Sequence, residues 1–324
     1  MLTRYQVALV FGSALFFAIL AVAQQGNVQE KPVKLTALAM LEAPREGCDK
    51  RYINMAISPD GQKVYAVAQL IHENPGKGPT PAGIVECWNW TQSKAKPVWS
   101  LELSKLVGGV GPTRPQILAL SPDGKHLALA DFDHVKILEA ATGKHVRDLA
   151  IAVPDGYTNR TVRAVAFSAD GRWLAGACAD HLMVWDLLRD TLQPYQVCRV
   201  RGRGINFLAL VRFMSDGEVV ALPSPAPSVS FWDVKTGRCL RTWERYGEEI
   251  SERRPQLDAC DLKMAILDGK PRFLIAYASA SNLVVFPPPP PPGTTWESRG
   301  EVHLVDSEGR LISKRQLGGS PLWQ

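Results

Sequence analysis

The chain has 324 residues, 46% of them hydrophobic, and a formal net charge of +5 at pH 7. This is enough for one large folded domain or two smaller ones, and so small a positive excess gives little support for an anionic partner. After the first residues, no stretch is long and apolar enough to cross a bilayer.

The N-terminus has the features of a leader that directs export. Arg4 gives a positive start, residues 7–22 are apolar, and 21–23 read Ala-Val-Ala, a cleavage signal. We therefore predict a signal peptide over 1–23 and a periplasmic or extracellular mature protein. Because the apolar core is slightly long, an uncleaved N-terminal anchor is the alternative.

Residues 24–49 form an N-terminal segment before the first repeated unit. Its beginning is polar, and 33–41 is mostly apolar and could make one strand. This strand is left over once the repeats described below are assigned. We expect it to pair with the last or the first unit and help to close a ring.

One pattern recurs along residues 50–318. An alternating apolar run meets a tight turn, a second apolar run follows, and a third run ends at a landmark position. Alternation broken by Asp-Gly is a strong hairpin signal. The turn reads Ser-Pro-Asp-Gly at 58–61 and 121–124, Ser-Ala-Asp-Gly at 168–171, and Ser-Asp-Gly at 215–217. The landmark is Trp-Asp at 185–186 and 232–233, and Leu138-Glu139 and Val305-Asp306 stand at the equivalent places in two other units.

These turns and landmarks resemble the WD40-repeat family, whose units carry an SPDG-like turn and a third strand that ends in Trp-Asp. The resemblance implies an all-β fold, a β-propeller of four-stranded blades, with five units visible here. It also implies a set of structural blade anchors, namely Asp170, Gly171, Trp185, Asp186, Asp216, Gly217, Trp232 and Asp233. The usual Gly-His before the first strand is missing from every unit.

The spacing supports one repeating module. Asp123, Asp170 and Asp216 stand at steps of 47 and 46 residues, close to the period of a four-stranded blade, about 40–45 residues. Such a unit cannot bury both faces of its sheet alone, whereas neighbouring blades around an axis can bury them. We expect first strands to begin near residues 52, 116, 162, 208 and 262, and a tail at 319–324.

Insertions gather on one predicted face. The segments 72–83 and 283–300 separate second and third strands, and 104–114, 199–204 and 246–256 join a fourth strand to the next first strand. Because strands alternate in direction, all five leave the sheets at the same end. Loops on a rigid scaffold are common binding sites, so we predict partner docking on this face.

This predicted face contains residue types that dominate interface energetics. They are Arg199, Arg201, Arg203, Arg253, Arg254, Phe286 and Trp296. Six prolines at 287–292 should adopt polyproline II. They can serve as a stiff spacer or as a ligand for an aromatic groove, and the arginines can be an anion site or simply solvated.

The sequence contains few motifs that could bind a metal or take part in catalysis. Asp133-His134 and Asp180-His181 occupy equivalent turns, where an aspartate ordinarily caps its own backbone, and no third metal ligand is evident. Six cysteines in an exported chain permit disulfides, although several, Cys178 among them, can be small buried residues. We assign no catalytic, cofactor or metal residue.

The function predicted from sequence is an exported propeller that binds proteins as a scaffold, with no cofactor, no nucleic acid and no membrane contact beyond the leader. The partners cannot be named, and self-association is an option if the ring is incomplete. The alternative is a propeller enzyme or ligand-binding protein that uses the central pocket. Such a site would need several titratable side chains at the axis, where the sequence offers Asn54, Arg163 and Arg212.

Overall fold

The computed structural model describes thirteen segments of the chain. They are residues 48–72, 83–89, 91, 97–103, 117–130, 134–152, 162–200, 207–215, 217–224, 229–243, 257–267, 270–279 and 300–317. In these segments there is no helix that could span a membrane. The chain divides into two compact units, Met1–Gln116 and Ile117–Gln324, and each is treated by itself below.

Unit 1 contains one four-stranded antiparallel sheet with strands in chain order. Its strands are β1 (Cys48–Ile57), β2 (Lys63–His72), β3 (Ile84–Asn89) and β4 (Pro97–Glu102). The central strands are buried along most of their described length: Val64–Ala68 and Ile84–Trp88 all lie below 6% exposure. A buried carboxylate, Glu86, accepts a hydrogen bond of 2.8 Å from the Tyr52 hydroxyl.

Unit 2 contains four sheets of the same design, again with strands in chain order. The first sheet has β5 (Ile117–Leu120), β6 (His126–Ala130), β7 (His134–Glu139) and β8 (His145–Ala150), and the second has β9 (Val162–Phe167), β10 (Trp173–Cys178), β11 (His181–Asp186) and β12 (Gln196–Arg199). The third has β13 (Phe207–Ser215), β14 (Glu218–Ser224), β15 (Val229–Asp233) and β16 (Cys239–Trp243), and the fourth has β17 (Leu257–Leu267), β18 (Lys270–Ser279), β19 (Gly300–Asp306) and β20 (Leu311–Leu317).

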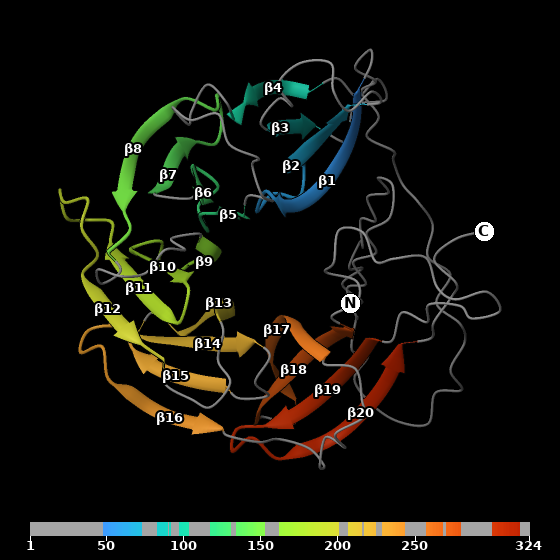
Figure 1. Cartoon of the computed structure of the whole chain (residues 1–324), viewed down its shortest axis with the longest axis vertical. Helices are drawn as coiled ribbons and strands as arrows, with labels where there is room; N and C mark the ends of the chain where they lie inside the picture. Colours follow the sequence, from blue (N-terminus) through green and yellow to red (C-terminus); the bar gives the residue numbers. More distant parts are fainter. Residues whose placement is uncertain are drawn as a thin grey trace, which may run out of the picture. The chain divides into compact units, whose positions relative to one another are not determined.

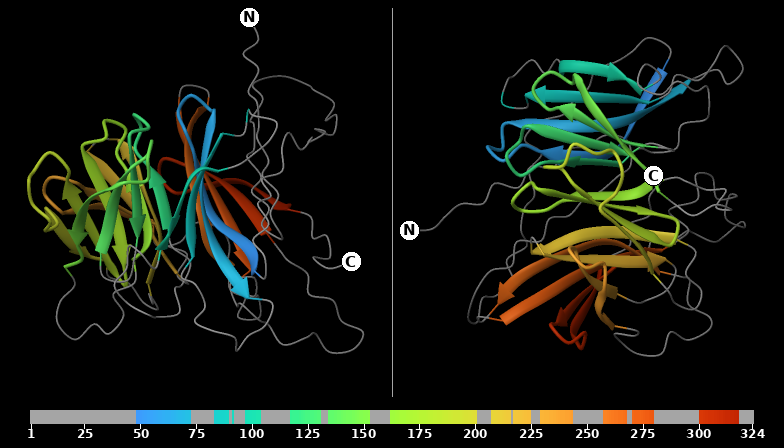
Figure 2. Two further views of the ribbon diagram at one scale, coloured as in Figure 1. Left: turned by 90° about the horizontal axis from the view of Figure 1, so that it is seen from above. Right: turned by 90° about the vertical axis from the view of Figure 1, so that its left-hand side faces the viewer.

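The sheets of unit 2 follow one another in chain order, with the first strand of each on the inner side and the fourth on the outer side (Figure 1). Figure 2 shows the same sheets from two further directions. The repeat predicted a four-stranded antiparallel sheet for each unit, and this is confirmed. First strands begin within one residue of the predicted starts at 116, 162 and 208, whereas β1 and β17 begin four and five residues before 52 and 262.

Apolar clusters join neighbouring sheets of unit 2. The cluster between the first and second sheets includes Ile137 and Trp185, the one between the second and third includes Leu182 and Trp232, and the one between the third and fourth includes Phe231. Each sheet therefore buries side chains on the faces it turns to its neighbours. This is the physical reason why a run such as Trp173–Cys178 is buried at every position instead of alternating.

The outer strands form a second set of contacts. The fourth strand of one sheet lies against the turn between the third and fourth strands of the next sheet. In β8, Arg147 donates through Nη2 to the carbonyl of Leu187 at 2.8 Å. In β12, Gln196 donates through Nε2 to the carbonyl of Lys235 at 2.8 Å. Polar side chains thus fasten consecutive sheets at the rim as well as in the core.

A third contact between neighbouring sheets is the close approach of the Gly309 backbone to the indole ring of Trp243. Gly309 has a φ of +83°, and a Cβ placed on it would lie 2.5 Å from Cγ of Trp243 in β16. A larger residue at 309 would have to displace the indole and adopt a left-handed backbone. Glycine at this turn therefore lets the third and fourth sheets of unit 2 meet.

Several sequence predictions fall outside the described residues. They are the leader over 1–23, the strand over 33–41 and its pairing, the tail over 319–324, and the loops that carry most of the predicted docking face. The boundaries drawn at residues 23, 49 and 318 stay predictions.

Candidate interaction surfaces

The turn between first and second strands has the same geometry in three sheets. Its serine hydroxyl accepts a hydrogen bond from the backbone N–H five residues later, at 2.8–2.9 Å, and donates to the aspartate two residues later. The serines are Ser58, Ser121 and Ser168, all buried. These hydrogen bonds lower the pKa of Asp60 and of Asp123. The recurring motif therefore closes a hairpin.

The predicted anchors divide into different structural roles. Trp185 is 1% exposed and donates through Nε1 to the carbonyl of Ala150, in the neighbouring sheet, at 3.1 Å. Trp232 is 9% exposed, and its Nε1 donates to Ser230 in its own strand. The two tryptophans thus stand at equivalent positions, but only the first forms a hydrogen bond across an interface between sheets.

The two aspartates that follow the tryptophans also differ. Asp186, with its side chain 2% exposed, accepts from Nε and Nη2 of Arg172 at 3.2 and 2.9 Å. These contacts hold the pKa of Asp186 below its ordinary value. Asp233 instead accepts from the backbone N–H and the hydroxyl of Thr236, which caps the following turn.

The remaining predicted anchors lie in hairpin turns. Asp170 accepts from Ser168, and Gly171, with a φ of +72°, completes that turn. Gly217 begins the return into β14. Asp216 lies outside the described residues.

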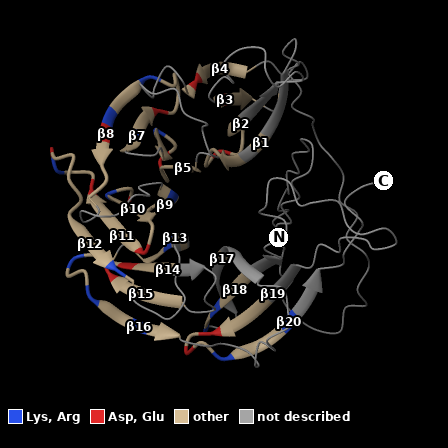
Figure 3. Ribbon diagram, viewed as in Figure 1, with Lys and Arg blue, Asp and Glu red and all other residues tan. Residues whose placement is uncertain are grey.

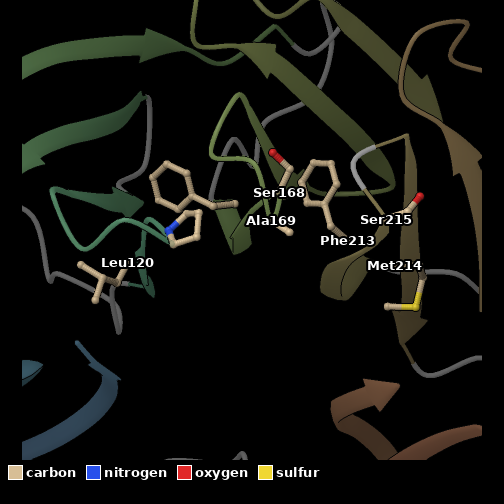
Figure 4. A pocket seen from close by; sticks show the side chains of 8 residues that line it. Leu120, Ser168, Ala169, Phe213, Met214 and Ser215 are labelled. Carbon is tan, nitrogen blue, oxygen red and sulfur yellow. The ribbon is translucent and has the colours of Figure 1, made fainter. Parts of the chain in front are cut away.

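A hollow of about 220 Å³ lies at the ends of the first strands in three consecutive sheets of unit 2 (Figure 4). It is lined by Leu120, Pro122, Phe167, Ser168, Ala169, Phe213, Met214 and Ser215. All eight residues are apolar or serine, so the hollow offers contact area and a few hydroxyl or backbone groups. None of these eight described residues has a titratable side chain that could act as an acid, a base or a metal ligand.

This hollow was not predicted from the sequence, although the repeat contains a pattern that indicates it. The residue immediately before the turn serine is large and apolar in four successive units: Ile57, Leu120, Phe167 and Met214. Each of these residues lies at or next to the end of its strand, beside a turn, where a solvent-exposed side chain is usually polar. In unit 1, Ile57 is 40% exposed.

A charged cluster lies at the opposite end of the second sheet of unit 2. Arg199 donates through Nε to Oδ2 of Asp180 at 2.8 Å, and Oδ1 of Asp180 lies 2.8 Å from Nδ1 of His181. His181 is 3% exposed, and burial lowers its pKa despite the neighbouring carboxylate. The carboxylate of Asp180 therefore lies between two side chains, and the expectation that it caps its own backbone stays a prediction.

On the predicted docking face, Arg199 is the one of the seven residues named from sequence that the structure describes. Arg199 lies there with its side chain 58% exposed, already paired with Asp180. Arg201, Arg203, Arg253, Arg254, Phe286 and Trp296 lie outside the described residues. Elsewhere in unit 2, Lys and Arg are interspersed with Asp and Glu along the outer strands and turns (Figure 3). Within the part of the chain that the structure describes, no three Asp, Glu, His or Cys side chains gather into a possible metal site.

Comparison with known proteins gives partial sequence matches. No family model matches the chain. It is 30% identical over 119 residues to target of rapamycin complex subunit LST8-1 of Arabidopsis thaliana, a match that covers 36% of each chain. It is 36% identical over 77 residues to target of rapamycin complex subunit wat1 of Schizosaccharomyces pombe, covering 24% of this chain and 23% of that one. The matched regions therefore span well under half of these relatives.

Solved structures match more of the chain at low identity. U3-55K superposes with a TM-score of 0.54 at 13% identity, over 85% of this chain and 66% of that one. The WD40 repeats of RRP9 give 0.54 at 14%, over 85% and 65%. Hydrazine synthase of Kuenenia stuttgartiensis gives 0.50 at 15%, over 90% and 70%. Likeness at this identity shows the fold alone, and the same fold thus occurs in a protein named as an enzyme.

The repeated serine–aspartate turn, the five four-stranded antiparallel sheets in chain order, the structural likeness and the two sequence matches lead to one conclusion. The chain has the β-propeller fold of WD40-repeat proteins.

Proposed function

We propose that this protein is an exported WD40-type scaffold that binds other proteins. The observation that carries the proposal is the match of its repeats to two proteins named as subunits of a complex. The hollow at the ends of β5, β9 and β13, lined by apolar side chains and two serines, offers a further contact surface. Apolar and aromatic surface on a rigid framework suits contact with a partner. A catalytic site would need convergent titratable groups.

The sequence relatives support the same class of function. Both are named as subunits of the target of rapamycin complex, so both act within protein assemblies. The matched regions cover only part of either protein, so the identity of their partners does not transfer to this chain. The shared feature is the framework of repeated sheets.

Two surfaces compete for the main partner contact. The face with the long connections, predicted from sequence, includes Arg199 and the segment 283–300. The hollow lies at the other end of the same sheets, where the serine–aspartate turns lie. We propose the face with the long connections as the principal docking surface, because its loops supply arginine and aromatic side chains, and we treat the hollow as the competing site.

A capture experiment from host extract tests both surfaces at once. Three baits are compared with the wild-type mature chain: one with 283–300 shortened, one with Ala169→Arg, and one with Ala141→Arg. Ala169 lines the hollow, and Ala141 is an equally exposed alanine in the turn after β7. Ala141→Arg is therefore a matched control for the added charge and bulk.

We expect the shortened loop to reduce the yield of specifically captured proteins by about tenfold, the loss of a single hot spot worth about 1.4 kcal/mol. Unchanged capture with the shortened loop, together with loss in Ala169→Arg, would place docking at the hollow. If all four baits capture the same background proteins, the scaffold function itself is refuted.

The proposed export is tested separately, by fractionation of the native host and mass spectrometry of the N-terminus. We expect the protein in the exported fraction with its chain beginning just after Ala23. Recovery of the full-length chain beginning at Met1 in the cytoplasmic fraction would refute export without affecting the scaffold proposal.

A further inference from the structure

Two cysteines stand on the outer strands of neighbouring sheets, next to the same interface. In the second sheet of unit 2, Cys198 on β12 is paired with Leu182 on β11. In the third sheet, Cys239 on β16 is paired with Trp232 on β15. Leu182, Trp232 and Cys198 belong to one apolar cluster between these sheets. Since paired residues share a face of the sheet, the side chain of Cys198 points towards this interface. Cys239 stands at a register shift next to Trp232, and its Sγ lies 3.4 Å from Oγ1 of Thr242, which pairs with Ser230 on the same strand as Trp232.

Direct contacts hold the two strand segments together. Sγ of Cys198 lies 3.4 Å from the carbonyl oxygen of Gly237, to which it donates. Gly237 is two residues before Cys239, in the turn that leads into β16. The bond from Gln196 to the carbonyl of Lys235 fastens the same strand to the same turn. The backbone two residues before Cys239 is therefore in contact with the thiol of Cys198.

The electrostatics of the pair agree with this geometry. Burial raises the pKa of the Cys198 thiol to about 11, and the charge on Cys239 contributes to the rise. Both thiols are free in this structure.

The two thiols differ in accessibility. Cys239 is exposed, whereas Cys198 is only 7% exposed. At present, Sγ of Cys239 lies 3.5 Å from the carbonyl oxygen of Arg241 and 3.4 Å from Oγ1 of Thr242. Rotation about its Cα–Cβ bond can turn this sulfur away from these weak contacts and towards Cys198.

We propose that Cys198 and Cys239 form an oxidation site, at which a disulfide links the second and third sheets of unit 2. The oxidant is a soluble or protein disulfide. The exposed Cys239 thiolate first attacks it, forming a mixed disulfide and releasing one thiol. The Cys198 thiolate then attacks Sγ of Cys239 and releases the second thiol. One disulfide is reduced to two thiols while two cysteines are oxidised to one disulfide, so electrons and protons balance.

The raised pKa of Cys198 sets the order and the pH dependence of these steps. Cys198 is almost entirely protonated at neutral pH, so the exposed Cys239 should react first. The second step needs the Cys198 thiolate and should become faster as the pH rises. Cys87 and Cys178 have 0% exposure and lie on other strands, so neither is part of the proposed site.

Non-reducing peptide mapping of the full chain tests the proposal. The native protein is incubated with oxidised glutathione between pH 7 and 9, its remaining thiols are blocked, and it is digested with trypsin. Cleavage after Arg189, Arg199, Arg238 and Arg241 releases the peptides 190–199 and 239–241. We expect these two to be recovered as one disulfide-linked species that disappears on reduction, and to form faster at pH 9 than at pH 7.

A stability measurement supplies an independent readout. Oxidation should raise the melting temperature of the wild-type chain by about 5–10 °C, since the link closes a long loop. Cys239→Ser, which changes an exposed residue, should show no such rise. Persistent glutathione on Cys239 without the linked peptide would overturn the proposal. Equal yields of the link from native and urea-unfolded protein would also overturn it, because the folded interface would then contribute nothing.

Discussion

Substitutions at Trp185 and at Gly176 should have coupled effects on the free energy of unfolding. Gly176 lies in the middle of β10, and a Cβ placed there would stand 2.8 Å from Cζ3 and 3.0 Å from Cη2 of Trp185. Both atoms belong to a ring that is 1% exposed and fixed by its hydrogen bond to the carbonyl of Ala150. The ring therefore cannot move aside without breaking contacts on the neighbouring sheet.

The magnitudes follow from this geometry. Gly176→Ala alone should lower the free energy of unfolding by about 1–3 kcal/mol through overpacking. Trp185→Leu alone should lower it by about 2–4 kcal/mol, from lost burial and the lost hydrogen bond. In the double variant the added methyl group has room, so Gly176→Ala becomes neutral or stabilises by up to about 1 kcal/mol. We expect a coupling energy of about 1–4 kcal/mol.

The assay is urea unfolding of the four proteins of the cycle, followed by far-UV circular dichroism, because tryptophan fluorescence changes with the substitution itself. Gly217→Ala is the matched control, since no atom lies within 4 Å of a Cβ placed at that turn. It should change stability by less than about 0.5 kcal/mol. If the two substitutions add to within about 0.3–0.5 kcal/mol, the reasoning that ties Gly176 to the indole is refuted.

Three further predictions concern the second sheet of unit 2. Ser168→Ala should lower the free energy of unfolding by about 1–2 kcal/mol in urea titrations, because it leaves the buried N–H of Trp173 without its 2.9 Å acceptor; an unchanged midpoint would contradict this. Asp186→Asn should cost about 1–2 kcal/mol at pH 7 through loss of the ion pair with Arg172. Because the folded pKa of Asp186 is depressed, the pair stabilises the fold above the ordinary carboxyl pKa, and its contribution is lost as the pH falls below about 4; a variant with the wild-type acid profile would count against it. The folded pKa of His181 is also depressed, from 6.5, so wild-type stability should decline as the pH falls below that value, and His181→Gln should flatten this decline in thermal melts between pH 7 and 5.

Much of the fold was readable from the chain because turn chemistry and strand alternation act locally. The Ser-x-Asp-Gly turns set the register of each hairpin, and the starts of β5, β9 and β13 were predicted to within one residue. The start of β17 was predicted less well. Its first residues, Leu257–Asp261, include a register shift between Ala259 and Asp261, and a bulge breaks the alternation that marks a strand.

The candidate sites were harder to predict, because their partners come from other segments. Lys136 stands in the middle of an apolar strand, and only the structure shows that it reaches Asp148 on the next strand at 3.1 Å. Asp180 was expected to cap its own turn, and only the structure shows that its carboxylate also contacts Arg199, 19 residues away, and His181. Spacing along the chain indicates which face a residue occupies, but it does not identify the side chain opposite.

The clusters between sheets in unit 2 have a consequence for how the protein opens. Within this unit, the second and third sheets each share an apolar cluster with a sheet on both sides. When stability is a sum of terms between neighbours, the elements with two such neighbours open at the highest cost. Amide protons of β10, β11, β14 and β15 should therefore exchange with solvent only through openings close to complete unfolding of the unit. A partner held by loops that flank these two sheets would meet a backbone that opens less often than that of the first and fourth sheets of the unit.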